Sequence, residues 1–168
     1  DAGQKYRECT DPPYNALKHQ DGLGVTKDVV DLLNDGITLL FFNGVNDLIC
    51  NHVGNELAVE NFKWDHQSEF LISKRYGWKA PSTGQLAGYM RGYKNLFYLK
   101  VLNSGHMVPL DVPDVSLDMM RNLVFGISFD DYEQQLARLA QSPGACPVCP
   151  SSSSNNECEA CPICPAPG

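Results

Sequence analysis

An aspartate and a histidine, Asp47 and His106, each follow shortly after a strongly apolar run of residues. Asp47 comes after residues 37–42, and His106 comes after residues 96–102. In doubly wound sheets, functional side chains collect at the carboxyl ends of strands, where neighbouring loops converge. A carboxylate that orients an imidazole forms the acid–base part of a Ser–acid–His triad, and the acid precedes the histidine here as it does there. The pattern predicts an acid–base pair, although a histidine in such a place is more often a plain surface or core side chain.

Three segments carry the apolar spacing of amphipathic helices. They run from Thr26, as N-cap, through Asn34, from His52 to Asn61, and from Pro113 through about Phe125. Gly36 and Gly126 end the first and the last in the usual way. The expected inward-facing residues are Val25, Val29, Leu32 and Leu33 in the first helix, Val53, Leu57 and Ala58 in the second, and Leu117, Met120 and Val124 in the third.

Strands are predicted over residues 37–42, 88–91 and 96–102, the last two joined by a turn. The first of these runs is apolar except for Thr38, and it is too short for a typical helix. It therefore predicts a strand that is buried on both faces. Strands that alternate with helices indicate an α/β fold, with a sheet flanked by helices.

The charge of the chain restricts its partners. Its 168 residues carry a formal net charge of −7, and its lysines and arginines are spread along the chain. A nucleic-acid partner is therefore not expected, because binding to a phosphate backbone needs a basic surface. No apolar stretch approaches the roughly 20 residues that are needed to cross a bilayer, so no membrane span is expected.

The composition changes towards the C-terminus. The last 28 residues hold six prolines, five serines and five cysteines. We expect residues 1–130 to form the folded body, and residues 131–168 to form a linker, with a short exposed helix over residues 130–140, followed by a flexible tail. The C-x-x-C spacings of Cys146–Cys149 and Cys158–Cys161 could bind zinc. In an oxidising compartment they more often serve disulfides, so no metal is expected.

Two segments of the chain resemble the serine carboxypeptidases. Residues 42–51 (FNGVNDLICN) are similar to the aspartate region of that family, and residues 105–113 (GHMVPLDVP) are similar to its histidine region. Residues 87–89 and 93–96 also look like the family, most closely the vacuolar carboxypeptidases of fungi. The resemblance covers about residues 8–129. It implies the C-terminal part of an α/β-hydrolase, whose sheet an N-terminal chain completes.

The resemblance also implies roles for single residues. His106 would act as general base and acid, and Asp47 would orient its ring. Met107 would line the pocket for the leaving residue, Cys50 would lie at the edge of the pocket for the penultimate side chain, and Gly105 would permit tight backbone geometry before the histidine. The alternatives are ordinary packing for Met107, a buried small hydrophobe for Cys50, and a common turn glycine for Gly105. No cofactor is implied.

The nucleophile of such a triad is not apparent in the sequence. No G-x-S-x-G elbow occurs, and in the family this elbow lies in the N-terminal part. The resemblance therefore implies an N-terminal large chain that carries the serine, with a disulfide through Cys9 as the hypothesis for their link. The expected substrates are the C-termini of peptides. A lysosomal or vacuolar location, or secretion, is expected from the family and from the acidic composition.

Two other functions stay open on the sequence alone. The first is a carboxypeptidase-like acyltransferase, which keeps the triad but transfers the acyl group to an alcohol. The second is a non-catalytic interaction protein on a hydrolase scaffold, which would use its cysteine-rich tail. Both Asp47 and His106 occur in intact motifs, and this argues against the second function.

Overall fold

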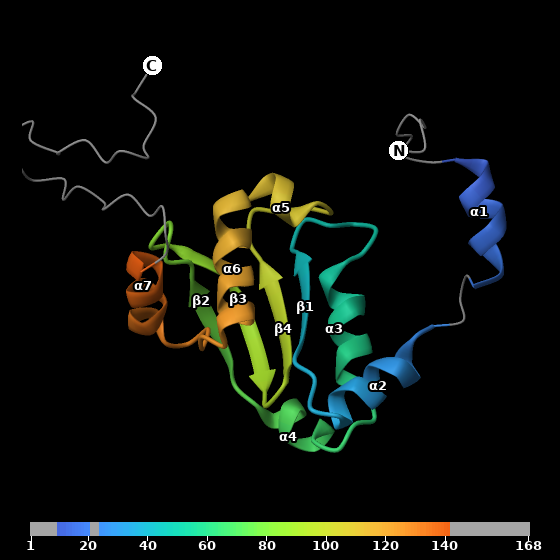
Figure 1. Ribbon diagram of the computed structural model, residues 1–168, viewed down its shortest axis with the longest axis horizontal. Coiled ribbons are helices and arrows are strands. Elements are labelled where there is room, and N and C mark those ends of the chain that lie inside the picture. Colours follow the sequence, from blue (N-terminus) through green and yellow to red (C-terminus); the bar gives the residue numbers. More distant parts are fainter. Residues whose placement is uncertain (1–9, 21–23, 142–168) are drawn as a thin grey trace, which may run out of the picture.

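A four-stranded mixed sheet with helices on both faces forms the body of the computed structural model, which describes residues 10–20 and 24–141 (Figure 1). In chain order the elements are α1 (Asp11–Leu17), the 3-10 helix η1 (Lys18–Gln20), α2 (Thr26–Asn34), β1 (Leu39–Gly44), α3 (His52–Glu60), α4 (Gln67–Ile72), β2 (Arg75–Lys79), β3 (Leu86–Tyr93), β4 (Leu96–Val101), α5 (Val108–Asp111), α6 (Pro113–Phe125) and α7 (Tyr132–Gln141).

The strand order of the sheet is β1-β4-β3-β2. Strand β1 runs parallel to β4, and Gly44 lies opposite Val101 at the ends of the two strands. Strand β3 is antiparallel to both β4 and β2. Because β1 and β4 run in the same direction, the loops that follow them leave the sheet at the same edge. The predicted sheet flanked by helices is confirmed, and its parallel pair brings the loops of Asp47 and His106 together.

The alternation of side chains along β4 feeds two hydrophobic cores, one on each face of the sheet. Leu99 and Val101 point to the face that α5 and α6 cover, and Leu96 and Tyr98 point to the other face. The first core contains Trp78, Ala80, Ala87, Met90, Leu99, Val101, Val108, Met119 and Phe129. The second contains Leu33, Val59, Phe62, Trp64, Phe70, Leu96 and Tyr98, contributed in part by α2, α3 and α4.

Helix α2 ends at Asn34 as predicted, but it begins one residue earlier than expected. Thr26 is its first helical residue, and Val25 occupies the N-cap position without a side-chain hydrogen bond to the helix. The prediction of Thr26 as N-cap is therefore wrong. Gly36 follows the helix with a φ of +79°, a left-handed conformation that suits the residue after a helix end. Leu33 is buried as expected, whereas Val25 and Leu32 are exposed.

Strand β1 spans Leu39–Gly44, two residues later than predicted, and the expectation that it is buried on both faces is wrong. Its apolar side chains are half-buried, and Phe42 is exposed. Within the described part of the chain, β1 pairs with β4 only and is an edge strand. An edge strand has a neighbour on one side only, so its side chains contact fewer residues than those of a central strand.

The predicted inward faces of two helices are also wrong. In α3 the expected stripe of Val53, Leu57 and Ala58 is exposed, and Val59 is the buried residue. In α6 the predicted extent is confirmed, but Leu117, Met120 and Val124 are exposed. The side of α6 that faces the molecule instead carries Ser116, Asp118, Met119 and Asn122.

Two of the inward polar side chains of α6, Asp118 and Asn122, bind other segments of the chain. A carboxylate oxygen of Asp118 accepts a hydrogen bond from the backbone N–H of Ser82 at 2.8 Å. The side chain of Asn122 donates to Gln135 of α7 at 2.9 Å. Buried polar side chains need such partners, and apolar periodicity alone does not reveal them.

Helix α7 confirms the short helix that was expected within the linker. Most of its described side chains are exposed, but Gln135 is buried. Its side-chain oxygen accepts hydrogen bonds from Nε1 of Trp78 and from Asn122, both at 2.9 Å. Helix α7 is thereby attached to the body. The expected cysteine-rich tail lies outside the described residues, and so does Cys9.

Strand β2 and helix α4 were not predicted. In β2, Arg75, Gly77 and Lys79 alternate with Tyr76 and Trp78. Two apolar residues are too few for the alternation of a strand to be recognised in the sequence. Among the described residues, no helix is long and apolar enough to cross a membrane.

Candidate active site

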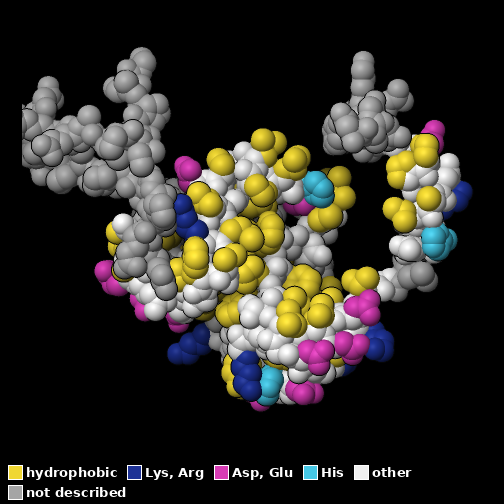
Figure 2. Space-filling model, viewed as in Figure 1, with side chains coloured by type: hydrophobic (Ala, Val, Ile, Leu, Met, Phe, Trp, Pro, Cys, Tyr) yellow, Lys and Arg dark blue, Asp and Glu magenta, His cyan; other side chains and the backbone are white. Residues whose placement is uncertain are grey.

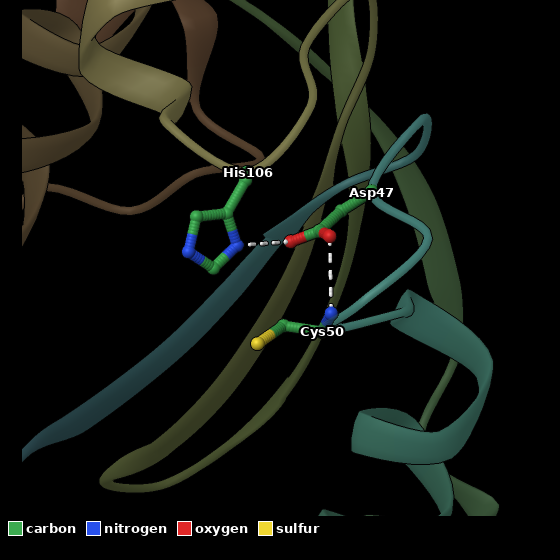
Figure 3. A group of neighbouring side chains, drawn as sticks. All are labelled: Asp47, Cys50 and His106. Atoms are coloured by element: carbon green, nitrogen blue, oxygen red, sulfur yellow. Dashed lines mark hydrogen bonds and ion pairs between the residues drawn. The ribbon is translucent and has the colours of Figure 1, made fainter.

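The side chains of Asp47 and His106 meet at the edge of the sheet where β1 and β4 end. Nδ1 of His106 lies 2.9 Å from Oδ2 of Asp47 (Figure 3). The two residues are 59 positions apart in the chain, and the parallel pairing of β1 with β4 brings their loops together. The predicted proximity of the acid and the histidine is therefore present. Their catalytic role stays a prediction.

The carboxylate of Asp47 is buried, and both of its oxygens accept hydrogen bonds. Oδ1 accepts hydrogen bonds from the backbone N–H groups of Ile49 at 2.9 Å and of Cys50 at 3.0 Å, while Oδ2 faces His106. Burial by itself raises the pKa of this carboxyl group. The hydrogen bonds from His106, Cys50 and Ile49 outweigh burial, so the pKa lies below its ordinary value of 3.8. Asp47 is therefore an anion at any pH near neutral.

The imidazole of His106 has one nitrogen bound and one nitrogen open. Because ionised Asp47 can only accept, Nδ1 carries the hydrogen in the neutral ring, and Nε2 is left with its lone pair. Nε2 points away from Asp47 (Figure 3), and no side chain in residues 10–20 and 24–141 forms a hydrogen bond with it. The ring is 61% exposed. An oriented imidazole with a free lone pair can take a proton from a group placed beside it.

Backbone contacts hold the two loops together. The N–H of Asn46 donates to the carbonyl of Ser104 at 3.0 Å, and the N–H of Val45 donates to the carbonyl of Val101 at 3.0 Å. Gly44 lies so close to the His106 loop that a Cβ atom there would be 2.2 Å from the carbonyl oxygen of Gly105. Gly44 must therefore be glycine if the loops are to keep this separation.

The structure places Gly105 differently from its expected role. A Cβ atom at Gly105 would make only an ordinary contact, 3.5 Å from Oδ2 of Asp111, and its φ is not in the left-handed region. The close approach belongs to Gly44 instead, so the expected reason for a glycine at position 105 is wrong. The N–H of Gly105 donates to Oδ2 of Asp111 at 2.7 Å, which holds the start of the His106 loop against α5.

Sequence reasoning missed Gly44 and Asp111 as parts of the site. Nothing near Gly44 in the sequence marks its role, because a close contact between Gly44 and Gly105 joins loops far apart in the chain and has no local signal. Asp111 lies in the segment that resembles the histidine region of the family. The similarity of that segment to the histidine region was the available hint.

Cys50 and Met107 both lie beside the acid–histidine pair. Cys50 is an exposed free thiol, so the alternative that it is a buried small hydrophobe is wrong. Met107 is 59% exposed and immediately precedes α5, which argues against a role in packing within the described residues. Two more apolar side chains at the rim, Leu48 and Ile49, are 88% and 83% exposed. The pair is thus surrounded by side chains that could contact a ligand.

Asp47, Cys50 and His106 also form a group that could hold a metal ion. Each offers one donor atom, and these atoms lie within 4.8 Å of one another. A carboxylate, a thiolate and an imidazole together suit zinc. Two of the three already satisfy each other, however, because Oδ2 of Asp47 and Nδ1 of His106 share a hydrogen bond. A metal ion would have to break that bond or use Nε2, so the geometry favours the proton relay.

Comparisons with known proteins identify the family. The family model of the serine carboxypeptidases matches residues 1–126. The chain is 34% identical over 134 residues to the pheromone-processing carboxypeptidase KEX1 of Phytophthora infestans, covering 80% of this chain and 22% of that protein. It is 40% identical over 98 residues to carboxypeptidase Y of Saccharomyces cerevisiae, covering 58% of this chain and 18% of that protein. The chain thus spans about a fifth of the length of these relatives.

A solved structure supports the same assignment. The crystal structure of KEX1(delta)p, a prohormone-processing carboxypeptidase from Saccharomyces cerevisiae, superposes with a TM-score of 0.50 at 27% identity, covering 60% of this chain and 22% of that chain. The mixed sheet with helices on both faces is thus part of an α/β-hydrolase fold. On both the sequence match and the fold, the chain belongs to the serine carboxypeptidase family.

Proposed function

We propose that this chain supplies the aspartate and the histidine of a serine carboxypeptidase that removes single residues from the C-termini of peptides. The observation that carries the proposal is the hydrogen bond from His106 to buried Asp47, which leaves Nε2 open to the surface. Membership of the family adds the reaction, because the relatives are named as carboxypeptidases.

The mechanism follows from the free Nε2 of His106, which can accept a proton and later give it back. Nε2 of His106 takes the proton of a serine hydroxyl as the serine oxygen attacks the scissile carbonyl carbon. The protonated ring then gives this proton to the nitrogen of the departing residue, the C–N bond breaks and an acyl-enzyme forms. Water repeats the same two steps and releases the shortened peptide. Asp47 keeps Nδ1 protonated and stabilises the positive charge that appears on the ring.

The serine and the oxyanion donors come, in this proposal, from an N-terminal polypeptide that docks against β1. Two observations support a docking surface there. Strand β1 is an edge strand among the described residues, and an unpaired edge invites another strand. Helix α3, which contacts β1, exposes the apolar side chains Val53 and Leu57, and α6, which lies over β3 in Figure 1, exposes Leu117, Met120 and Val124. Figure 2 shows hydrophobic side chains gathered over α5 and α6 on the visible face.

Cys50 and Met107 are proposed to contact the substrate. Both are exposed beside the acid–histidine pair, which is the position that a pocket for the last two residues of a peptide requires. Met107→Ala should change the preference for the leaving residue, and a thiol reagent on Cys50 should block the pocket for the penultimate one. Unchanged preferences in both experiments would contradict these assignments.

The proposed function is tested on the chain together with the polypeptide that co-purifies with it. A blocked dipeptide and an acyl-glucose donor with an alcohol acceptor separate carboxypeptidase from acyltransferase activity. His106→Ala should lower kcat on a blocked dipeptide by about 10⁶-fold, by analogy with other triads. The matched control is His66→Ala. His66 also contacts a charged neighbour, Lys94, at 2.8 Å, but it directly precedes α4, which Figure 1 shows below the opposite ends of the strands.

Three outcomes would count against the proposal. Transfer to alcohol without hydrolysis would point to an acyltransferase, and a co-purifying polypeptide without an elbow serine would point to a non-catalytic protein. Equal activity of His106→Ala and the wild-type protein would exclude the mechanism.

The link between the two polypeptides and the location of the protein are proposals as well. A disulfide through Cys9 predicts that reducing agent separates this chain from its partner on electrophoresis, and an unchanged pattern would exclude that bond. A lysosomal or vacuolar location, or secretion, agrees with the net charge of −7 and with the family. Fractionation of cells tests the location.

A further inference from the structure

One side chain ties together the two ends of the loop that carries Asp47. Asn43 lies near the end of β1, and its Nδ2 donates a hydrogen bond to the backbone carbonyl of Cys50 at 3.0 Å. Residues 44–49 lie between these two points and include the catalytic candidate Asp47. The bond therefore closes the loop across its base, which limits the number of conformations that the loop can adopt.

The same bond is one step in a continuous path to the acid–histidine pair. The peptide N–H of Cys50 donates to Oδ1 of Asp47 at 3.0 Å, and Oδ2 of Asp47 faces Nδ1 of His106 at 2.9 Å. The carbonyl of Cys50 is held from the other side by Asn43 and also by Asn55, at 3.1 Å. Cys50 thereby links Asn43 to the Asp47 carboxylate, through its carbonyl on one side and its N–H on the other.

Tyr98 orients Asn43 from inside the core. Its hydroxyl lies 3.1 Å from Oδ1 of Asn43 and 2.7 Å from the carbonyl of His52, so these two acceptors share its single hydrogen. Tyr98 is only 1% exposed. Burial, and then the negative charge of Glu56, raise the pKa of the phenol above its usual value of 10.0, so the group stays a donor. With Oδ1 fixed by Tyr98, Nδ2 of Asn43 faces Cys50.

We propose that Asn43 is a positioning residue, set by Tyr98, which holds the Asp47 loop so that the carboxylate meets Nδ1 of His106. This inference rests on the proposed function, because it concerns how the triad is kept in register. Displacing a group of an active site by about 1 Å costs on the order of 10²-fold in rate. Loss of the Asn43 bond should therefore lower kcat far more than it changes KM.

The test uses Asn43→Ala, Asn43→Asp and Tyr98→Phe in the intact protein, together with its N-terminal polypeptide. Asn43→Asp keeps the size of the side chain but turns an acceptor towards the Cys50 carbonyl. We expect kcat to fall about 10- to 100-fold in both Asn43 variants, with KM within about twofold. Tyr98→Phe should lower kcat less. Tyr98→Phe should also add nothing to Asn43→Ala, because both act through one path.

Two matched controls separate positioning from general destabilisation. Asn61→Ala removes a side-chain-to-backbone bond of the same kind, from Nδ2 to the carbonyl of Leu57 at 2.7 Å, just beyond the far end of α3. Tyr76→Phe removes a phenol hydroxyl from the same sheet, on β2. Both controls should keep kcat. Controls that lose as much kcat as the Asn43 variants would overturn the inference.

A second measurement does not depend on turnover. In the wild-type protein, the hydrogen between Nδ1 of His106 and Asp47 should give a downfield proton NMR signal, and in Asn43→Ala this signal should broaden or move upfield. A signal and a kcat that both match the wild type would overturn the inference. If wild-type protein shows no peptide hydrolysis, the proposed function fails, and the NMR comparison still decides whether Asn43 positions the pair.

Discussion

The two outer strands of the sheet, β1 and β2, are covered to different degrees. At the β2 end, which we define by β2, Phe129 and α7, the chain covers itself. Trp78 is fully buried, the ring of Phe129 meets it edge-on with centroids 5.5 Å apart, and Gln135 accepts the indole hydrogen. The side-chain nitrogen of Gln135 also donates to the carbonyls of Ser128 and Phe129, both at 3.1 Å. Every polar group of Gln135 is thus satisfied.

At the β1 end, which we define by β1, the Asp47 and His106 loops and the outer face of α3, apolar groups are exposed, and they are exposed on the outer face of α6 as well. Val124 is 68% exposed, and the imidazole of His106 points its free nitrogen outward. Monomeric proteins seldom expose large apolar patches unless a partner covers them. In the proposed function the two ends have different roles. The β2 end stabilises the fold, and the β1 end carries the acid–histidine pair and contacts the N-terminal polypeptide. The predictions below test this separation.

The largest effect is expected from Asp47→Asn at the β1 end. The amide cannot hold His106 in the required tautomer, so kcat on a blocked dipeptide should fall by about 10⁴-fold, by analogy with other triads. The free energy of unfolding should change much less than the activation barrier. Asp31→Asn on α2, where the carboxylate pairs with Lys27 at the surface, is the control and should keep full activity. Wild-type turnover in Asp47→Asn would contradict the assignment of chemistry to this end.

Phe129→Ala should have the opposite signature at the β2 end. It removes a buried ring from against Trp78 and Phe97, so the free energy of unfolding should fall by about 3–5 kcal/mol in denaturant titrations. The kcat of the folded fraction should be unchanged. Ile72→Ala, at an exposed apolar position on α4, should cost less than about 0.5 kcal/mol. A loss of kcat in folded Phe129→Ala would show that the two ends are not separate.

The outer face of α6 should matter for association rather than for stability. Burying Val124 beneath a partner is worth about 1.5–3 kcal/mol, so Val124→Asp should weaken binding to the N-terminal polypeptide by at least that amount in titration calorimetry. Replacing exposed Glu133 on α7 by Ala is the control at the β2 end. Equal binding by Val124→Asp and the wild-type protein would mean that the partner does not cover α6.

The smallest effect concerns an ion pair behind the site, between Glu56 and Lys100, which lie 2.7 Å apart. Burial raises the pKa of Glu56, but Lys100 and Arg75 outweigh burial and bring it below its ordinary value of 4.5. A lowered carboxyl pKa adds stability above the unfolded value, and this stability is lost as the pH falls through the folded value. Glu56→Gln should therefore be less stable than wild type near neutral pH, by about 1 kcal/mol.

The gap between Glu56→Gln and the wild-type protein should close below about pH 4.5, because the protonated glutamic acid then resembles glutamine. Unfolding curves measured at several pH values check this. A gap that stays constant down to strongly acidic pH would show that charge is not its cause.

Local sequence determined much of what surrounds the site. The extent of α6 from Pro113 to Phe125 follows from a proline at its start and Gly126 at its end, which adopts the left-handed conformation. The positions of Asp47 and His106 after two apolar runs follow from the same kind of local pattern. Caps, turns and apolar runs act over a few residues, so they can be read without knowing the fold.

Tertiary structure alone decided which residues meet. The spacing in α6 could not show that Met119 faces the core and Leu117 faces outward, because a periodic pattern marks a face without naming its neighbour. The contact of Gly44 with Gly105, and the path from Tyr98 through Asn43, join segments about 60 residues apart. Such contacts exist only after β1 and β4 have paired in register, and no local preference of the chain encodes that pairing.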